Sequence, residues 1–368
     1  MAIDRIKRRK GDSYRVRMYV NGVRVSRTFD RKIDAIAFEK EAQLDNRLIE
    51  AGKLTFAEAA EDWLTNHAEA RKAPRSVATD RQMLRDNLLP RFGKMMLAKV
   101  TPDQVDRLIQ ELRKTGIKDN TINKNLQLLR AIFNFHMKRR RVQYNPVVPV
   151  GLLKIQIPSV VFWTQNETLQ FLNYAEKKYA GTGREVIAFM VKFALNTGMR
   201  MGEIVALSWH DVDMDNRLIT VRRSYDSFQR CIRESTKGRK IRHVPINSAI
   251  YDDLARMRES RRHELVFTIN GSVIDRSNLT HDFQRDAVEA GVRKIRFHDL
   301  RHTYASHFMM NGGDIYHLKE ILGHSDMLMT QRYAHLSRRF LVDKADTVCF
   351  SSSGNVIKVE FQKSAVGV

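Results

Sequence analysis

The chain has 368 residues, enough for two or three domains with substantial cores. Its 64 lysines and arginines outnumber its 42 aspartates and glutamates, so the net charge is +22 and the pI is near 10.1, which favours a polyanionic partner such as nucleic acid. The two cysteines form no Cys-x-x-Cys pair, which excludes a disulfide scaffold and a cysteine zinc site and fits a reducing cytoplasm.

A basic membrane-binding protein is the competing interpretation of this charge. Such proteins carry a polybasic block beside an apolar anchor. The longest apolar stretch here, residues 186–195, is interrupted by Lys192 and is too short to span a bilayer. The basic N-terminus is followed by no apolar segment, so we expect no secretory signal. The expected protein is cytoplasmic and has no membrane partner.

The first fifty or so residues are expected to form a small unit. Two alternating segments, residues 14–20 and 23–29, flank Asn21-Gly22, a strong hairpin signal because a type I′ turn needs two residues with positive φ. From Asp30 the spacing of apolar residues predicts a helix over the apolar sheet face. The open sheet face would then present cationic side chains to a DNA major groove, or form an ordinary solvated surface. The candidate DNA-binding residues are Arg15, Arg17 and Arg24.

The next unit, residues 53–148, is predicted to be helical throughout. A capping box at Thr55 and Glu58 begins the first helix, and a second helix after Pro74 is predicted to stop at Pro90. Two further helices follow, the last of which ends in a run of four basic residues. The unit is compatible with a DNA-gripping module, although basic helical bundles have many other uses.

The third and largest unit follows a linker rich in valine and proline. The apolar run at residues 186–195 predicts a helix that is buried on most sides. Short strands are predicted at residues 218–221 and 242–246, and helices dominate from there to about residue 345. Near the C-terminus, residues 355–361 form one alternating segment after a hinge of serine and glycine.

Two clusters in this unit place a cation beside a turn. Arg200 follows the helix-breaking Gly198 and stands at the opening of the next helix, where unpaired N–H groups favour an anion. Glu203, one turn later, would fix its guanidinium, or the two would form an ordinary surface ion pair. Lys237 stands on a turn between two predicted strands, from which it would reach over a substrate or remain a solvated loop lysine.

Two more clusters carry histidines and a tyrosine. His298 and Arg301 are three residues apart, so they project from one helix face and suit an anionic oxygen. No His-Glu-x-x-His motif or similar ligand spacing indicates a metal site. His324 precedes Tyr333, which we expect to be exposed and poised at the end of a short helix, although a packing role is commoner for a tyrosine. Together the clusters would bind a phosphate, protonate a leaving oxygen and supply a nucleophile without metal.

The order and spacing of these clusters resemble the tyrosine recombinase family, the phage-type site-specific integrases. The resemblance is strong over about residues 160–340. The helical unit fits the family's core-binding domain more loosely, and the N-terminal unit is similar to an arm-type DNA-binding domain. The matching segments are residues 197–203, Thr236-Lys237, residues 298–302, residues 322–324 and Tyr333.

The resemblance implies a multi-domain, mainly α fold with small β elements. Residues 1–52 would form an arm-type DNA-binding domain with a three-stranded sheet plus a helix, and residues 53–148 a helical core-site DNA-binding bundle. Residues 159–345 would form the α+β catalytic domain, and residues 346–368 a C-terminal tail that packs in cis or docks on a neighbouring protomer.

The resemblance also implies roles for the site residues. Tyr333 would attack the scissile phosphate and form a 3′-phosphotyrosyl link. Arg200 and Arg301 would hold the non-bridging oxygens, His324 would donate to the same phosphate, and Lys237 would protonate the departing 5′-oxygen. His298 would assist proton transfer at the tyrosine, and Asp299 and Glu203 would support the others.

The implied activity is integration and excision of a phage or integrative element through a Holliday junction, without cofactor, metal or ATP. The implied partners are double-stranded DNA attachment sites, three further copies of the chain in a tetramer, a DNA-bending host factor and an excision factor. The protein would associate with the nucleoid when bound to DNA.

Two other functions remain open from the sequence. A type IB topoisomerase shares this chemistry but relaxes DNA without partner exchange, and the arm-like and core-binding units count against it. A DNA-binding regulator with a decayed catalytic domain is the non-enzymatic alternative. The complete set of candidate residues argues against it, and Tyr333→Phe would leave its function untouched.

Overall fold

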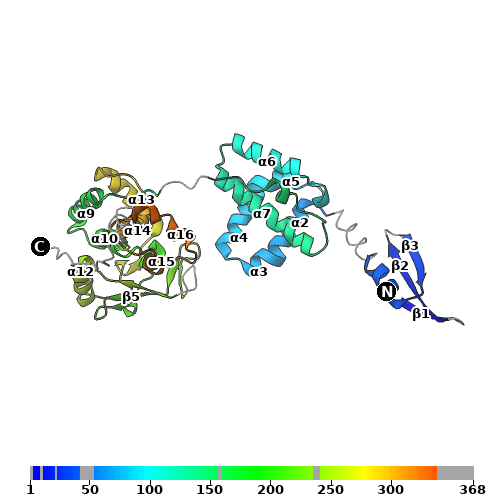
Figure 1. Cartoon of the computed structure of the whole chain (residues 1–368). Coiled ribbons are helices and arrows are strands. Elements are labelled where there is room, and N and C mark those ends of the chain that lie inside the picture. Colours follow the sequence, from blue (N-terminus) through cyan, green and yellow to red (C-terminus); the bar gives the residue numbers. More distant parts are fainter. Residues whose placement is uncertain are drawn as a thin grey trace, which may run out of the picture. The chain divides into compact units, whose positions relative to one another are not determined.

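The computed structural model describes residues 3–8, 11–20, 23–41, 54–155, 160–234 and 241–337 (Figure 1). The chain divides into two compact units, Met1–Ile157 and Pro158–Val368. Lys237, the Asn21-Gly22 turn and the alternating segment at residues 355–361 lie outside the described residues. None of the helices in the described part of the chain combines the length and hydrophobicity that crossing a membrane requires.

The N-terminal sheet has three antiparallel strands in the order β1 (Ile3–Arg8), β2 (Gly11–Val20) and β3 (Val23–Phe29). Residues 32–41 are helical. Val16 and Met18 of β2 and Ala35 of the helix are buried together, so the helix covers the apolar sheet face as predicted. The expected three-stranded sheet plus helix is confirmed.

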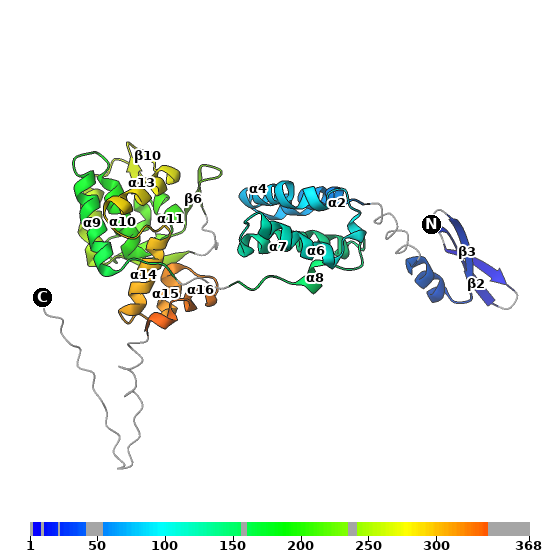
Figure 2. The ribbon, with the colours of Figure 1, turned by 90° about the horizontal axis from the view of Figure 1, so that it is seen from above.

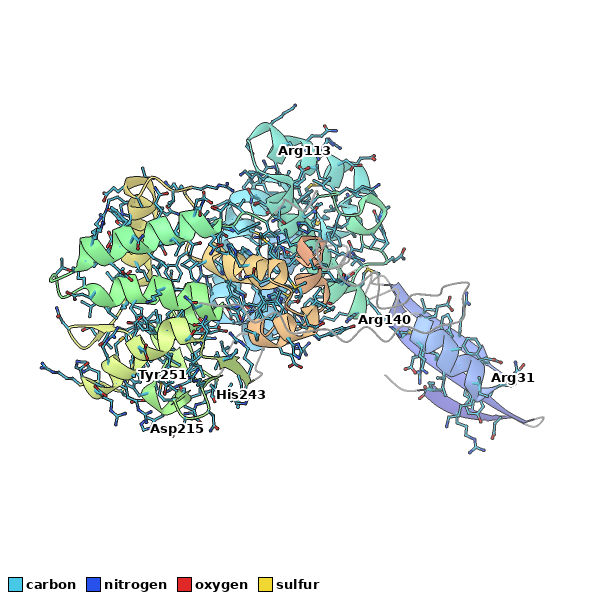
Figure 3. The ribbon with its side chains drawn as sticks, turned by 60° about the vertical axis from the view of Figure 1, so that its left-hand side comes forward. Arg31, Arg113, Arg140, Asp215, His243 and Tyr251 are labelled. Atoms are coloured by element: carbon cyan, nitrogen blue, oxygen red, sulfur yellow. The ribbon has the colours of Figure 1, made fainter. Side chains whose placement is uncertain are left out.

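The candidate DNA-binding arginines of this sheet differ in their surroundings. Arg17 is exposed, and its Nε donates to Asp4 Oδ2 at 3.0 Å. Arg15 is half-buried, and the side chain of Arg24 lies outside the described part. Charged side chains also mark the outside of the other parts of the chain, as with Arg113, which is ion-paired to Asp119 (Figure 3).

The central part is helical throughout, as predicted. Its longer helices are α2 (Phe56–Trp63), α4 (Pro74–Met83), α6 (Pro102–Lys114) and α7 (Asp119–Lys138). The shorter ones are α3 (Glu69–Arg71), α5 (Leu89–Phe92) and α8 (Val147–Val150). The predicted capping box of Thr55 and Glu58 forms, and Thr101 and Gln104 form a second one at the start of α6.

The prediction that Pro90 stops a helix is wrong. The backbone continues from α4 through a π-helical segment, Leu84–Leu88, directly into α5. Pro90 stands in the first turn of α5, where a missing N–H removes no bond that the helix needs. The π-helical segment therefore lets the chain pass a proline without ending the helical path.

In the second unit, Pro158–Val368, helices surround a small sheet of β4 (Val212–Asp213), β5 (Leu218–Val221) and β8 (Arg242–Pro245). Two hairpins are separate from this sheet: β6 (Ser224–Asp226) with β7 (Cys231–Arg233), and β9 (Thr268–Ile269) with β10 (Ser272–Val273). The strands predicted at residues 218–221 and 242–246 correspond to β5 and β8.

Helix α10 (Glu185–Thr197) is the buried helix that the apolar run predicted, and it contacts α9 (Gln165–Tyr179), α12 (Ser248–Glu259) and α14 (Asp299–Met310). The other helices are α11 (Met201–Val205), α13 (Arg276–Glu289), α15 (Ile315–Leu322) and α16 (Leu328–Gln331), followed by a 3-10 turn, Ala334–Ser337. Figure 2 shows α14, α15 and α16 grouped together in this unit. The candidate residues of this unit that the structure describes lie in or just before α11 and α14, and in the turns after α15 and α16.

Candidate active site

The Arg200 turn is fixed by a glycine. Helix α10 ends at Gly198, which has a φ of 61° and so adopts the left-handed conformation that favours glycine. A Cβ atom at this position would lie 2.6 Å from Cδ1 of Tyr304 and 2.9 Å from Cδ2 of Leu322. Arg200 then occupies the N-cap of α11. Close packing against α14 and α15 therefore sets where Arg200 stands.

A buried carboxylate joins Arg200 to a second arginine. Glu203 is 2% exposed and accepts from Nη1 and Nη2 of Arg242 at 2.9 and 2.6 Å. Arg200 Nη1 donates to the same carboxylate at 2.9 Å. Desolvation alone would raise the pKa of Glu203, but the hydrogen bonds and charge of Arg242, with Arg200, lower it to about 2. Glu203 is thus an anion at pH 7, and it orients both guanidinium groups.

Arg301 is hydrogen-bonded to two turns of the cluster. It is 3% exposed, and its Nη1 donates to the Gly198 carbonyl at 2.8 Å while its Nη2 donates to the Leu322 carbonyl. Burial and the charge of Arg200 lower the pKa of Arg301 to about 9, so it remains a cation at pH 7. The turn before Arg200 and the turn before His324 are therefore held to one side chain.

His324 follows a second left-handed glycine. Gly323 has a φ of 63°, and a Cβ atom there would lie 2.7 Å from Cδ of Arg242. His324 Nδ1 lies 2.9 Å from Oγ1 of Thr330, and the ring is half-buried. Burial, followed by the charges of Arg301 and Arg200, lowers the pKa of His324 to about 3. The imidazole is neutral at physiological pH and lies in the field of the arginines.

The expectation that Tyr333 is exposed is wrong. The residue stands just after α16 and is 1% exposed, because its ring packs with Ala305, Leu318 and Leu322 in a separate apolar cluster. Its hydroxyl is hydrogen-bonded to Nδ1 of His302. Burial raises the pKa of Tyr333 despite the opposing charges of Arg332 and Arg301. The phenol is therefore protonated in this state.

The two histidines of the 298–302 segment occupy different places. The ring of His298 meets the ring of His302 edge to face, with centroids 5.4 Å apart, and it is His302 that bonds to the Tyr333 hydroxyl. Asp299 is buried and accepts from the backbone N–H of Arg296 at 2.8 Å and from its Nη2 at 2.7 Å. These contacts lower the pKa of Asp299 against its desolvation. Asp299 thus anchors the start of α14.

Sequence reasoning missed three residues of this cluster, namely Arg242, His302 and Thr330. Arg242 lies on β8, 39 positions from Glu203, and its alternating strand pattern carried no sign that it faces a buried carboxylate. His302 lies in the segment 298–302 that the sequence analysis singled out, and its position directly after Arg301 is the sequence feature that could have indicated a role in the site. Lys237, which completes the predicted set, lies outside the described residues.

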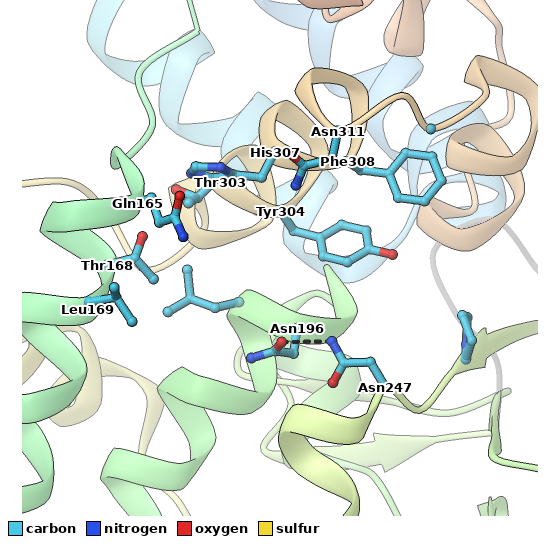
Figure 4. Close-up of a pocket in the computed structure, with 13 residues that line it drawn as sticks. Gln165, Thr168, Leu169, Asn196, Asn247, Thr303, Tyr304, His307, Phe308 and Asn311 are labelled. Atoms are coloured by element: carbon cyan, nitrogen blue, oxygen red, sulfur yellow. Dashed lines mark hydrogen bonds between the residues drawn. The ribbon is translucent and has the colours of Figure 1, made fainter. Parts of the chain in front are cut away.

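Two pockets lie near α14. The larger, of about 560 Å³, is lined by Tyr304, His307 and Phe308 of α14 and by Asn196 and Asn247, whose side chains bond at 2.7 Å (Figure 4). Its described lining includes none of the predicted catalytic residues.

The smaller pocket, of about 360 Å³, is lined by His302 and Asp299 together with Lys294, Arg296 and Arg332. His302 connects this pocket to the tyrosine, because the same ring lines the pocket and bonds to the Tyr333 hydroxyl.

Two family models match the chain, that of the phage integrase family over residues 162–339 and that of the phage integrase central domain over residues 56–151. The chain is 28% identical over 256 residues to tyrosine recombinase XerD of Chlorobaculum tepidum, which covers 66% of this chain and 79% of that protein. It is 26% identical over 341 residues to the integrase of Haemophilus phage HP1, which covers 89% of this chain and 93% of the integrase.

Solved structures show the same fold. The Tn1549 transposon integrase in complex with transposon right-end DNA matches with a TM-score of 0.66 at 19% identity, over 80% of this chain and all of that chain. A lambda integrase tetramer bound to a Holliday junction matches with a TM-score of 0.62 at 15% identity, over 89% and 96% of the two chains. The chain belongs to the phage integrase family and is a tyrosine-type site-specific recombinase.

Proposed function

We propose that this recombinase cuts and rejoins double-stranded DNA at the attachment sites of a phage or integrative element, with Tyr333 as the nucleophile. The observation that carries the proposal is the set of contacts around Arg301. This side chain bonds to the turns that precede Arg200 and His324, and Tyr333 lies close enough for the charge of Arg301 to act on its pKa. Side chains from three sequence segments thereby meet where one phosphate fits.

The contacts of the arginines with the phosphate are expected to strengthen most between the bound substrate and the transition state. Guanidinium groups of Arg200 and Arg301 hold the two non-bridging oxygens, on which negative charge develops as the nucleophile attacks. His324 Nδ1 is hydrogen-bonded to Oγ1 of Thr330, and in the tautomer in which the hydroxyl donates, the Nε2–H of the ring is left to donate to the phosphate. Glu203 keeps Arg200 oriented and does not itself contact the phosphate.

In the cleavage step, a bond forms between Oη of Tyr333 and phosphorus while the bond from phosphorus to the 5′-oxygen breaks. Lys237 gives a proton to that oxygen, whose alkoxide is otherwise a poor leaving group. The 3′-phosphotyrosyl link conserves the phosphodiester bond, so rejoining needs no ATP. Two such exchanges pass through a Holliday junction and recombine two duplexes.

The burial of Tyr333 is consistent with a resting state that precedes cleavage. A nucleophile must come within about 3–3.5 Å of the reacting atom, and a side chain that is 1% exposed does not present its hydroxyl to DNA. We propose that binding of DNA, together with a neighbouring copy in a tetramer, moves the segment after α16 and uncovers the tyrosine. The tail at residues 346–368 is the proposed link to that neighbour.

The remaining assignments divide the chain by task. Residues 1–52 are proposed to bind arm-type DNA with Arg15, Arg17 and Arg24, residues 53–148 to bind the core site, and residues 159–345 to catalyse. The excess of positive charge supports DNA as the partner, and the matched lambda integrase was solved as a tetramer on a Holliday junction. A DNA-bending host factor and an excision factor complete the proposed assembly.

A suicide-substrate assay tests the proposal. Nicked DNA that carries the element's own junction is mixed with wild-type protein or with Tyr333→Phe in the presence of EDTA. A covalent protein–DNA adduct for the wild type alone is the expected result. Binding without an adduct would favour the DNA-binding regulator, and relaxation of plasmids that lack the junction would favour the topoisomerase.

A further inference from the structure

The nucleophile has a specific hydrogen-bond partner in the structure. The hydroxyl of Tyr333 bonds to Nδ1 of His302, and the centroids of the two rings are 5.9 Å apart. Because Tyr333 is 1% exposed, bulk water does not reach the hydroxyl to take its proton. The imidazole is therefore positioned to receive the proton that the phenol must lose on attack.

The place of His302 in the fold keeps it at the site of reaction. It follows Arg301 directly on α14, so the proposed phosphate-binding arginine and the imidazole share one rigid helix. The 3-10 turn Ala334–Ser337, which follows Tyr333, also contacts α14. A movement that uncovers Tyr333 would displace the segment after α16 and leave His302 in place on α14, directly after Arg301.

The protonation state of His302 fits this position. Burial and then the charges of His298 and Arg332 lower the pKa of His302 to about 4, so the ring is neutral at pH 7. In the tautomer that carries its proton on Nε2, Nδ1 accepts the hydrogen bond from the Tyr333 hydroxyl. A phosphate bound nearby adds negative charge and so makes the imidazolium easier to form. The titratable and charged groups that act on the ring or line the pocket beside it, besides Tyr333, are His298, Asp299, Arg296, Lys294, Arg332 and His324.

We propose that His302 is the catalytic residue that accepts the proton of Tyr333 during cleavage, an inference that rests on the proposed function. As the bond from Oη to phosphorus forms, the phenolic proton passes to Nδ1 of His302. Lys237 protonates the 5′-oxygen as its bond to phosphorus breaks, and rejoining reverses both transfers. His298, to which the family resemblance assigns this proton, instead contacts His302 edge to face.

The test separates proton acceptance from simple hydrogen bonding. In His302→Asn, Oδ1 still accepts a hydrogen bond from the hydroxyl but takes no proton. Single-turnover cleavage of nicked suicide DNA should fall by about 10²- to 10⁴-fold at pH 7. Between pH 7 and 9 its rate should rise about tenfold per pH unit, because the phenolate must form unaided, while the wild-type rate stays flat. His307→Asn on the same helix is the matched control expected to keep the flat profile, and His298→Asn tests the alternative assignment of the proton to His298.

A modified substrate distinguishes the base from the acid. With sulfur in place of the bridging 5′-oxygen, the leaving group departs without protonation, so this substrate should restore cleavage by Lys237→Ala but not by His302→Asn. Conversely, 2,3-difluorotyrosine at position 333 has a more acidic phenol and should restore cleavage by His302→Asn. DNA binding and thermal unfolding of each variant show whether it is folded.

Several results would overturn the inference. They are a rate for His302→Asn within threefold of wild type, a faster rate, which would make His302 a restraint on the tyrosine, or transfer of the pH slope to His298→Asn. If His302→Asn does not fold, nitrogen-15 NMR of the wild-type protein decides, since a protonated Nδ1 on His302 contradicts proton acceptance. Failure of the proposed function is a separate result, because the wild type itself would then form no adduct.

Discussion

Replacement of Glu203 by glutamine tests the electrostatic account of the site. The carboxylate is 2% exposed, and its pKa falls from 4.5 to about 2 because Arg242 and Arg200 outweigh its desolvation. At 1.36 kcal/mol per pKa unit, the charged form contributes about 3 kcal/mol to folding at pH 7. Removing one partner of a buried ion pair destabilises a fold by a similar amount, about 3–5 kcal/mol. Because the folded-state pKa is lowered, this contribution is complete above pH 4.5 and is lost as the pH falls toward 2.

The expected result for Glu203→Gln is therefore a loss of about 3 kcal/mol in the stability of the catalytic unit at pH 7. Denaturant-dependent hydrogen exchange of peptides from α11 and β8 measures this loss in the full chain and separates it from the central helices. Glu176→Gln, an identical change at an exposed position on α9, should leave the exchange unchanged. A loss below about 1 kcal/mol for Glu203→Gln would show that the network is worth no more than a surface ion pair, and the reasoning would fail.

Two further predictions concern the same cluster. Gly323→Ala should destabilise the unit by about 1–3 kcal/mol and slow adduct formation, because φ is 63° and the new Cβ would displace Arg242. Gly181→Ala, where φ is 70° and no atom lies within 4 Å, should retain wild-type cleavage, and equal slowing of both variants would contradict this account. Acid should also weaken the fold. The pKa values of His302 and His324 fall from 6.5 to about 4 and 3, so the unfolded chain takes up protons that the folded one refuses as the pH drops from 6.5 to about 4. Melting temperatures between pH 7.5 and 4 check this, and a decline that begins only below pH 4.5 would assign it to carboxylates instead.

Local signals predicted much of the fold. The capping box at Thr55 and the apolar run of α10 each specify structure within a few residues of themselves. The prediction that Pro90 ends a helix fails because it, too, rests on a local signal. Whether a proline ends a helix depends on the hydrogen-bond pattern of the preceding turn, and the π-helical segment before it has no sequence signature at this level.

The site was predictable only in part, because a sequence motif identifies candidate residues but does not say which other side chains they contact. Spacing and resemblance singled out Arg200, Arg301, His324 and Tyr333, and the structure describes all four near α14. The burial of Tyr333 depends on the packing of α15 and α16 against α14, which no single segment encodes. The contact between Glu203 and Arg242 likewise forms only when β8 is placed beside the end of α15.

Positive charges outnumber negative ones among the side chains around Arg301, and this excess favours an anionic ligand. Glu203 is the carboxylate that contacts both Arg200 and Arg242, so one negative charge meets two positive ones before Arg301 is counted. Burial, and after it the charges of neighbouring arginines, lowers the pKa values of Arg301 and His324. A phosphate diester, the ligand that we propose for this site, would add negative charge beside these cations. Its binding would offset part of the repulsion among the arginines and so stabilise the folded unit.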